Sequence, residues 1–260
     1  MGAGLKLELQ NISKTYQTRT HAVTALENIT FSVAPGEFVC LVGPSGCGKS
    51  TLLNILAGLE SPTAGSVFDS NKEISGPDPS RVLIFQDPTL FPWLTVKSNV
   101  EFGLKMKGVS AKKRSEDAER LLRMVHLEHF GSVWIHELSG GMRQRVALAR
   151  ALAVEPEILL MDEPFGALDA ITRDLLHAEV QELWAKTGKT IVFVTHNVRE
   201  AVVLGDRVLI LCARPGRLVA EHKVDLPRPR QIEDVETVNL ARRVMADLQI
   251  PRENHVEDRV

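Results

Sequence analysis

The hydrophobic pattern of the chain changes in character at about residue 37. Two earlier segments, residues 5–9 (LKLEL) and 29–33 (ITFSV), alternate apolar and polar positions with a period of two. This alternation is typical of half-buried antiparallel strands. Residues 37–42 (EFVCLV) instead form, after the glutamate, a continuous apolar run that ends before a glycine. Such a run predicts a strand that is buried on both faces of a sheet.

Further apolar runs of the same kind follow along the chain. They are residues 81–85 (RVLIF), 157–162 (EILLMD), 190–195 (TIVFVT) and 207–212 (RVLILC). Because patterns typical of helices lie between them, we expect an α/β fold with a mainly parallel sheet.

Residues 87–155 interrupt this alternation, because they are rich in helix-forming residues. Within residues 110–127, apolar residues recur with helical spacing at Ala118, Leu121, Leu122 and Val125. We interpret residues 87–155 as a helical sub-domain inserted into a domain that spans residues 1–225.

A C-terminal tail, residues 226–260, is predicted to follow this domain. The prolines of residues 225–230 (DLPRPR) stop regular structure. We expect the tail then to form an amphipathic helix with a buried face. The apolar residues of that face are Val235, Val238, Leu240, Val244 and Leu248.

Charge and cysteine content restrict the class of protein. With 31 basic and 33 acidic residues the formal net charge is -2. This balance argues mildly against nucleic acid as the main partner. Three separated cysteines favour neither a disulfide framework nor a zinc site. The first residues do not resemble a signal peptide, and no stretch of 18 apolar residues could span a membrane. We therefore expect a soluble chain in a reducing cytoplasm.

Residues 43–51 (GPSGCGKST), between a buried strand and a helical pattern, match the phosphate-loop pattern GxxxxGK[ST]. Glycines let backbone N–H groups close around phosphate oxygens, and the helix start adds its positive dipole end. Lys49 would reach the β and γ phosphates, and the Ser50 hydroxyl would bind Mg²⁺. The predicted nucleotide-binding residues of this loop are Gly43, Pro44, Ser45, Gly46, Cys47, Gly48, Lys49, Ser50 and Thr51.

Cys47 lies inside this loop, and two interpretations of its side chain are open. It is either a small filler residue or a thiol whose alkylation blocks nucleotide binding.

Residues 158–164 (ILLMDEP) carry an apolar run into two adjacent carboxylates, Asp162 and Glu163. The carboxyl end of a buried strand is where α/β sheets present ligands, and an acid at this place in P-loop proteins helps to hold Mg²⁺. This role suits Asp162. Glu163 points differently and suits a general base that polarises a water for attack on the γ-phosphate.

A second anion site is predicted at residues 136–152 (HELSGGMRQRVALARAL). Ser139 is a candidate N-cap, and Gly140 and Gly141 allow a ligand to approach the backbone closely. The helix start that follows is suited to an anion, although a purely structural cap is the alternative.

These motifs, in this order and spacing, resemble the ATPase of ATP-binding cassette (ABC) transporters. The shared elements are GPSGCGKST, Gln86 after VLIF, LSGGM, LLMDEP, ALD at residues 167–169 and VTH at residues 194–196. The resemblance covers about residues 5–225, and the LSGG element separates this family from other P-loop proteins. It implies a P-loop NTPase core with an N-terminal antiparallel β sub-domain and the inserted helical sub-domain. It also implies a head-to-tail homodimer, with each ATP between the phosphate loop of one chain and the LSGG helix of the other.

The resemblance implies roles for further residues. Tyr16 is similar to the aromatic residue that stacks on adenine. Gln86 is similar to the glutamine that contacts Mg²⁺ and the attacking water. His196 is similar to the switch histidine that contacts the γ-phosphate.

Two more positions are assigned to the partner-facing side. Ser139 and Gly141 resemble the residues that grip the γ-phosphate bound by the partner chain. Asp169 resembles the residue that crosses the dimer seam.

An aromatic segment lies in residues 87–104 (DPTLFPWLTVKSNVEFGL). Its apolar cluster comprises Leu90, Phe91, Pro92, Trp93 and Leu94. The cluster could be the core of the helical sub-domain, or it could line the groove that receives a short helix of a membrane subunit in this family.

The segments LFPWLTVKSNV, LARALAVEPEILLMDEPFGALDAITR and the ending ARPGR to DLPRPR resemble the nitrate, sulfonate and taurine branch of bacterial importers. That branch implies an ATPase bound peripherally to the cytoplasmic face of the inner membrane. Its partners would be an integral-membrane permease and an external solute-binding protein. The alternative is an ABC ATPase that acts on DNA, ribosomes or cluster assembly; the absence of a long coiled coil and of a second cassette in the sequence speaks against it.

Overall fold

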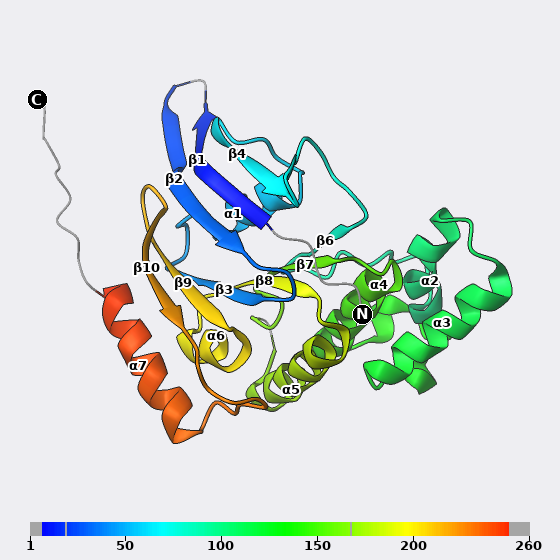
Figure 1. Ribbon diagram of the computed structural model, residues 1–260. Coiled ribbons are helices and arrows are strands. Elements are labelled where there is room, and N and C mark those ends of the chain that lie inside the picture. The colour runs from blue at the N-terminus through cyan, green and yellow to red at the C-terminus, as the bar shows by residue number, and fades with distance from the viewer. Residues whose placement is uncertain (1–6, 19, 167, 250–260) are drawn as a thin grey trace, which may run out of the picture.

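The computed structural model describes residues 7–18, 20–166 and 168–249. Its centre is a six-stranded sheet with the order β10-β9-β3-β8-β7-β6 (Figure 1). The strands are β3 (Phe38–Val42), β6 (Arg81–Ile84), β7 (Ile158–Asp162), β8 (Thr190–Thr195), β9 (Arg207–Cys212) and β10 (Arg217–Lys223). All neighbouring pairs are parallel except β10 and β9, which are antiparallel. The prediction of a mainly parallel sheet is therefore confirmed.

A second, antiparallel sheet has the order β2-β1-β4-β5. Its strands are β1 (Leu7–Gln17), β2 (Ala22–Val33), β4 (Ala64–Asp69) and β5 (Lys72–Glu73). β1 and β2 are longer than the alternating segments that predicted them. Register shifts after Leu9, Ile12 and Lys14 interrupt the alternation of apolar and polar positions, so the pattern did not reveal the rest of these strands. Leu5 and Lys6 of the first predicted segment lie outside the described residues.

The α-helices lie on both faces of the six-stranded sheet or, between β6 and β7, extend beyond it (Figure 1). They are α1 (Lys49–Leu56), α2 (Val96–Met106), α3 (Ala111–Met124), α4 (Gly140–Ala153), α5 (Ala170–Thr187), α6 (Val198–Leu204) and α7 (Val235–Gln249). Two short 3-10 helices, Glu128–Phe130 and Ile135–Glu137, precede α4.

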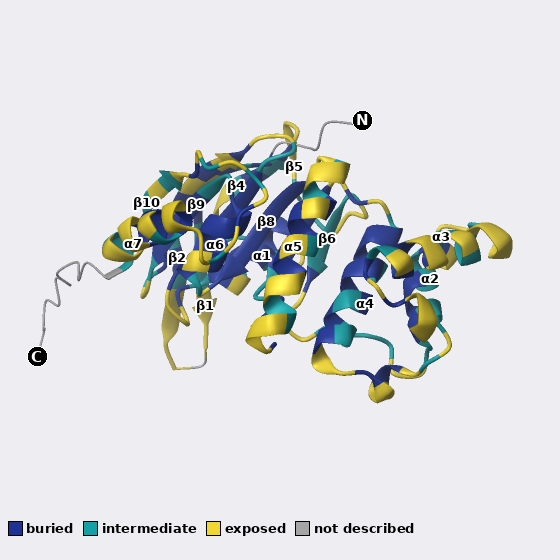
Figure 2. Ribbon diagram, turned by 90° about the horizontal axis from the view of Figure 1, so that it is seen from below, coloured by how far each residue is buried: buried dark blue, intermediate teal, exposed yellow. Residues whose placement is uncertain are grey.

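Successive residues of the buried strands face opposite sides of the sheet, as the strand period of two requires. On β3, Val39 and Leu41 join a hydrophobic cluster with α1 and the antiparallel sheet, whereas Phe38, Cys40 and Val42 join the cluster formed with α2 to α7. Both faces of this strand are therefore buried, which explains its continuous apolar sequence. The strands at the centre appear as buried ribbons in Figure 2.

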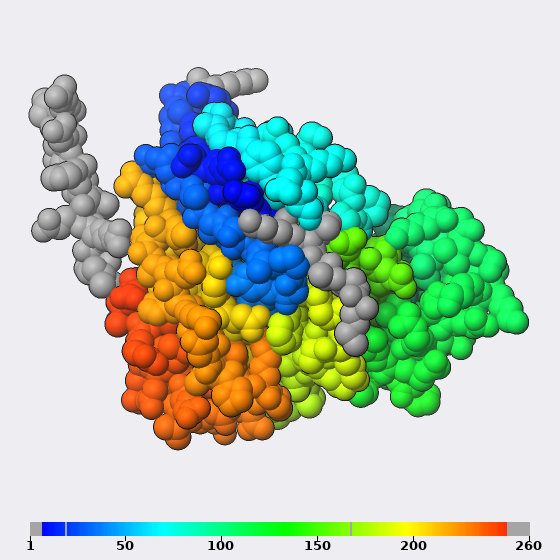
Figure 3. Space-filling model, viewed as in Figure 1, coloured from blue at the N-terminus to red at the C-terminus, as the bar shows by residue number. Residues whose placement is uncertain are grey.

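The segment between β6 and β7 forms most of a lobe at one end of the molecule, opposite the C-terminal segment (Figure 3). Its helix α3 buries Ala118, Leu121 and Leu122, and Val125 follows on the same buried side. The apolar face predicted for residues 110–127 is thus present. The domain boundaries at residues 87, 155 and 225 remain predictions.

Helix α7 packs against α6, β9 and β10. The prediction that Val235 lies on its buried face is wrong, because this side chain is 74 % exposed at the first residue of the helix. The buried positions of this helix begin at residue 237 and recur with helical spacing. They are Thr237, Leu240, Ala241 and Val244.

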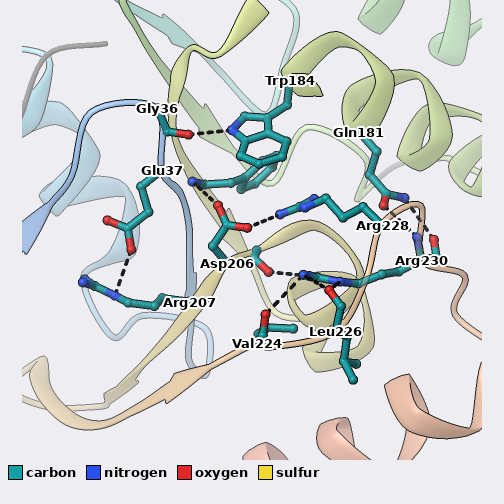
Figure 4. A network of polar contacts seen from close by, with 12 residues as sticks. Gly36, Glu37, Gln181, Trp184, Asp206, Arg207, Val224, Leu226, Arg228 and Arg230 are labelled. Carbon is teal, nitrogen blue, oxygen red and sulfur yellow. Dashed lines mark hydrogen bonds and ion pairs between the residues drawn. The ribbon is translucent and has the colours of Figure 1, made fainter. Parts of the chain in front are cut away.

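Residues 225–230 contain no regular structure, as predicted, yet they are anchored to the core by Arg230 (Figure 4). Its side chain is 5 % exposed and donates hydrogen bonds to four backbone carbonyls. The carbonyls belong to Val202, Gly205, Val224 and Leu226. Burial lowers the pKa of Arg230 to about 10, so the guanidinium remains charged at neutral pH.

The neighbouring Arg228 lies over the ring of Trp184, with its guanidinium carbon 4.2 Å from the ring centroid. Its Nη2 is 2.8 Å from Oδ1 of Asp206, whose other oxygen accepts a hydrogen bond from the backbone N–H of Phe38. The C-terminal segment is therefore tied to β3, the strand that leads into the phosphate loop.

Candidate functional site

The phosphate loop joins β3 to α1 and depends on glycines in the left-handed region. Gly46 has φ 78° and Gly48 has φ 91°. A β-carbon on Gly48 would stand 2.6 Å from Cδ2 of Leu26 and 2.9 Å from the carbonyl oxygen of Ala25. A side chain at residue 48 is therefore excluded by both conformation and space.

The start of α1 is suited to an anion. Gly48 is its N-cap and offers no side-chain hydrogen bond to the first turn, so the backbone N–H groups there have no side-chain cap. Lys49 is 5 % exposed, and its Nζ donates to the carbonyl oxygens of Gly43 at 2.8 Å and Pro44 at 3.1 Å. A buried ammonium group beside a helix start whose N-cap residue has no side chain fits the phosphates of a nucleotide.

Asp162 is the last residue of β7, and its carboxylate accepts a side-chain hydrogen bond from Ser50. Burial raises the pKa of Asp162 above its usual value, and the nearby Glu163 adds to the shift; Ser50 and Lys49 oppose it. A hydroxyl and a partly buried carboxylate in contact form a donor pair of the kind that Mg²⁺ prefers. The two residues thus fit the metal that the sequence predicts here.

Glu163 has φ 41°, which is rarely adopted by a residue with a side chain. Strain of this kind persists where the surrounding structure holds a functional group in a required position. The Glu163 carboxylate contacts two of the predicted residues. Its Oε1 lies 3.6 Å from Nζ of Lys49, and its Oε2 lies 2.8 Å from Nδ1 of His196.

Gln86 follows β6 and reaches the same loop. Two side-chain atoms lie close to the position that a β-carbon on Gly166 would take. Nε2 of Gln86 lies 3.9 Å from this position, and Oε2 of Glu163 lies 3.8 Å from it. The backbone carbonyl of Gln86 accepts a hydrogen bond of 2.9 Å from Nε2 of Gln144 on α4. Gln86 therefore lies between the carboxylates and the helix of the LSGG motif.

Tyr16, near the end of β1, lies beside the phosphate-loop helix. Its hydroxyl donates to Oε2 of Glu60 at 2.8 Å and lies 3.3 Å from Oγ1 of Thr51. The side chain is 37 % exposed, so one part of the ring is available for stacking.

Ser139, Gly140, Gly141 and Asp169 form a second group. Ser139 caps α4, and its Oγ accepts from the N–H of Met142 at 3.3 Å; Asp169 caps α5 by accepting from the N–H of Thr172 at 3.0 Å. The two helix starts are in contact, because a β-carbon on Gly141 would lie 2.8 Å from Cγ2 of Thr172. Among the described residues, no hydrogen bond or ion pair joins this group to the phosphate loop. Ala167 of the ALD motif lies outside the described residues.

The interpretation of Cys47 as a reactive thiol does not fit the structure. Its side chain is fully buried and packs in the cluster with α1. Burial also raises the pKa of the thiol, so the reactive thiolate is scarce at neutral pH. The filler interpretation fits, since Sγ of Cys47 lies 2.7 Å from the place of a β-carbon on Gly43.

The aromatic segment divides between the two interpretations left open by the sequence. Phe91 packs on Phe102 of α2 with ring centroids 4.5 Å apart, whereas Trp93 is 69 % exposed and touches Phe91 from outside. A cavity of about 420 Å³ lies beside Phe91, between β6, α2 and α4. Part of the segment is core, and part is a free apolar surface next to a hollow.

The sequence patterns did not predict some residues near the site. Asn197, next to His196, caps α6 by accepting from the N–H groups of Arg199 at 3.0 Å and Glu200 at 3.4 Å. The pattern of asparagine followed three residues later by glutamate is a helix-start signal that could have identified it. His177 and Gln144 carry no such signal, because they lie inside helices.

Comparison with known proteins gives consistent matches. A family model described as "ABC transporter" matches residues 26–166. An uncharacterised ABC transporter ATP-binding protein of Methanocaldococcus jannaschii is 48 % identical over 93 % of this chain and 90 % of that protein. The taurine import ATP-binding protein TauB of Burkholderia pseudomallei is 51 % identical over 86 % of each chain. The nitrate import ATP-binding protein NrtD of Synechocystis is 43 % identical over 92 % of this chain and 90 % of that protein.

Solved structures match over most of the chain. A dimeric structure of the bacterial ABC transporter cassette MJ0796 has a TM-score of 0.78, with 37 % identity over 85 % of this chain and 100 % of that chain. A dimeric post-hydrolysis state of the same cassette, bound to ADP and phosphate, has a TM-score of 0.76 at the same identity and coverage. Over the described residues of the present chain, no helix is sufficiently long and apolar to cross a bilayer.

Proposed function

Because the chain belongs to the ABC transporter family, we propose that it is the ATP-hydrolysing motor subunit of a bacterial importer for a small anionic or zwitterionic solute. The observation that carries the catalytic part is the position of Glu163, whose carboxylate lies 3.6 Å from the phosphate-loop lysine and 2.8 Å from His196. The importer part is supported by similarity to import ATP-binding proteins for taurine and nitrate.

The active unit is a head-to-tail homodimer. In one chain the phosphate loop and the capped start of α4 belong to separate groups of residues. A symmetric dimer places Ser139 and Gly141 of one protomer opposite the phosphate loop of the other, and so uses each group twice. Asp169, at the start of the adjacent α5, then lies at the seam between the protomers.

Within each site, the phosphate loop and Lys49 bind the triphosphate, and Tyr16 stacks on the adenine. Ser50, Gln86 and Asp162 would hold Mg²⁺, and the bound ion would neutralise charge on the phosphates. Among the residues that the structure describes, no group of three or more His, Cys, Asp or Glu side chains could hold a metal. Mg²⁺ usually shares its ligands between one or two carboxylates, water and substrate phosphates.

Hydrolysis uses Glu163 as the general base. Its carboxylate accepts a proton from a water whose oxygen attacks the γ-phosphorus, and the bond from that phosphorus to the leaving ADP oxygen breaks. His196 holds the carboxylate in place through the bond between Nδ1 and Oε2 and contacts the γ-phosphate.

The exposed Trp93 and the neighbouring cavity receive a short helix of a permease. The motor is bound peripherally at the cytoplasmic face of the bacterial inner membrane. An external solute-binding protein delivers the solute, and selectivity among solutes such as nitrate, sulfonates or taurine resides in those partners. An ABC ATPase that acts on DNA or ribosomes would not need the exposed aromatic surface.

Affinity purification from native membranes tests this function. The tagged chain is purified from detergent-solubilised membranes, and the co-purifying proteins are identified by mass spectrometry. A multi-span permease that is lost with the Trp93→Ala variant is the expected result. Recovery of ribosomes, DNA or cluster-assembly proteins, with no permease, would overturn the importer role.

A further inference from the structure

Behind Glu163 and His196, a second histidine and a second glutamate meet in the protein interior. His177 is 3 % exposed and Glu200 is 4 % exposed. Nε2 of His177 lies 2.7 Å from Oε1 of Glu200, which is the distance of a strong hydrogen bond. Neither residue touches the phosphate loop or has a role in the mechanism above.

Each member of this pair lies on a helix that begins next to a functional residue. His177 is on α5, which Asp169 caps, and Glu200 is on the first turn of α6. The side chain of Asn197, which follows His196 in the chain, accepts from the N–H of Glu200 at 3.4 Å. A shift of Glu200 therefore moves the cap residue that is covalently joined to His196.

His177 also contacts the loop that begins at Glu163. The rings of Phe165 and His177 pack edge to face with centroids 5.7 Å apart. Phe165 is 4 % exposed, and the next residue, Gly166, donates its N–H to the carbonyl oxygen of Glu163 at 3.1 Å. The position of the His177 ring is thus transmitted to the backbone of Glu163 through one buried side chain.

A small cavity of about 20 Å³ lies beside Glu163 and His196. Its lining also includes Glu200 of the buried pair and Phe165, whose ring contacts His177. This volume holds about one water molecule. Glu200, one member of the buried pair, therefore borders the same cavity as Glu163 and His196.

The burial of His177 and Glu200 has a free-energy cost that a contact between two apolar side chains would not have. Nδ1 of His177 is buried without a hydrogen-bond partner among the described residues, and the nearest carboxylate oxygen, on Asp174, is 3.7 Å away. A buried polar group left unpaired destabilises the fold. An apolar pair of similar size would avoid this cost, so a reason to retain the histidine is needed.

We propose that His177 and Glu200 are positioning residues, which hold the loop of Glu163 and the start of α6 in the relative geometry that the reaction needs. The inference rests on the proposed catalytic roles of Glu163 and His196. It concerns their alignment only, and it predicts a loss of turnover without a loss of ATP binding.

The test replaces His177 with glutamine and with asparagine, whose side-chain amides take the places of different imidazole nitrogens. In His177→Gln, the amide nitrogen stands near the place of Nε2 and can still donate to Glu200. In His177→Asn, the shorter side chain leaves its amide near the place of Nδ1 and cannot reach Glu200. We expect His177→Asn to lower kcat of the full-length ATPase about tenfold with KM for ATP within about twofold, because misplacement of reacting groups lowers rate. His177→Gln should restore kcat to within about twofold of the wild type.

His222 supplies a matched control. Its Nε2 lies 2.7 Å from Oδ2 of Asp247, so the same bond joins β10 to α7 at the edge of the sheet. His222→Asn should leave kcat within about twofold of the wild type, although it breaks a bond of the same length. Urea unfolding of all the variants measures the loss of stability separately.

Turnover of His177→Asn equal to the wild type, or equal losses in the Gln and Asn variants, would overturn the proposal. If His177→Asn does not fold, Glu200→Asp replaces it, since a carboxylate shorter by one methylene keeps its charge but withdraws from Nε2; wild-type kcat there would also overturn the proposal. A failure of the proposed function is distinguishable, because it would appear as ATPase activity that is absent from the wild type or is unaffected by Glu163→Gln.

Discussion

The two oxygens of the Glu163 carboxylate lie against different partners, and the closer one is His196, whose Nδ1 is 2.8 Å from Oε2. The other oxygen lies 3.6 Å from the ammonium group of Lys49. Glu163 follows β7 and His196 follows β8, and these strands are neighbours in the sheet. Two strand ends therefore hold one carboxylate between a histidine and the phosphate-loop lysine.

The first prediction concerns the charge of this carboxylate. Glu163→Gln keeps the size of the side chain but removes the proton acceptor. We expect ATP binding to persist, while turnover falls roughly 100-fold or more, which is the scale of a general base. Steady-state ATPase assays and equilibrium nucleotide binding measure the two effects.

Glu37→Gln is a control for this change. Glu37 has a similarly small exposed fraction, and its Oε1 pairs with Arg207 at 3.2 Å near the start of β3. Turnover of this variant should match the wild type. If Glu163→Gln also turned over at the wild-type rate, another group would have to activate the water.

The second prediction concerns Trp93. Because it is 69 % exposed, its replacement by alanine should change stability by only about 0.5 kcal/mol. We expect solute transport in vesicles that contain the permease to fall about tenfold, since aromatic anchors dominate protein interfaces, while the basal ATPase activity is retained. Met106→Ala, at the far end of α2 and 66 % exposed, is the matched control. Equal transport by the two variants would contradict a docking role for Trp93.

The third prediction concerns the cysteines. Cys40 and Cys47 are fully buried, and burial raises the pKa of both thiols, whereas Cys212 is partly exposed. Since a raised pKa leaves less thiolate at neutral pH, we expect N-ethylmaleimide to modify only Cys212 in the native protein and all three cysteines in urea. Peptide mass spectrometry after timed labelling measures this. Labelling of Cys47 as fast as Cys212 would show that the phosphate loop opens readily.

The elements that the sequence predicted well share a simple physical origin. Runs such as residues 191–194 are apolar at every position because neighbouring strands and the layers packed on both faces of the sheet leave them no contact with water. The phosphate loop was equally recognisable, because the left-handed conformation at Gly46 and Gly48 restricts these positions to glycine. In the first case burial restricts the choice of residue, and in the second case the backbone conformation does; both leave a recognisable pattern in the sequence.

Features that depend on distant contacts were not predictable. Arg230 follows a proline-rich segment, where a charged residue is expected at the surface. Its partners are backbone carbonyl groups, which every residue has, so the sequence does not indicate that this arginine is buried. Val235 was placed on the buried face of α7 because periodicity does not show where a helix first meets the core. The contact between His177 and Glu200 joins helices whose packing angle no local pattern specifies.

The fourth prediction concerns Arg230. Replacement by methionine removes the donors of four backbone carbonyls, and we expect the free energy of unfolding to fall by about 3 kcal/mol or more. Urea denaturation of the full chain measures the change. Arg217→Met is the control, because its ion pair with Glu27 is largely exposed and should contribute at most about 1 kcal/mol. A similar small loss in both variants would show that the C-terminal segment contributes little to the fold.

The position of β6 at the edge of the central sheet separates two parts of the molecule that can change independently. The aromatic segment leaves the sheet from this outermost strand, whereas Glu163 and His196 follow the inner strands β7 and β8. The surface around Trp93 can therefore change without displacing Glu163 or His196, because these residues end different strands. Gln86 does not share this independence, because it follows β6 and its side chain lies beside the loop that follows Glu163.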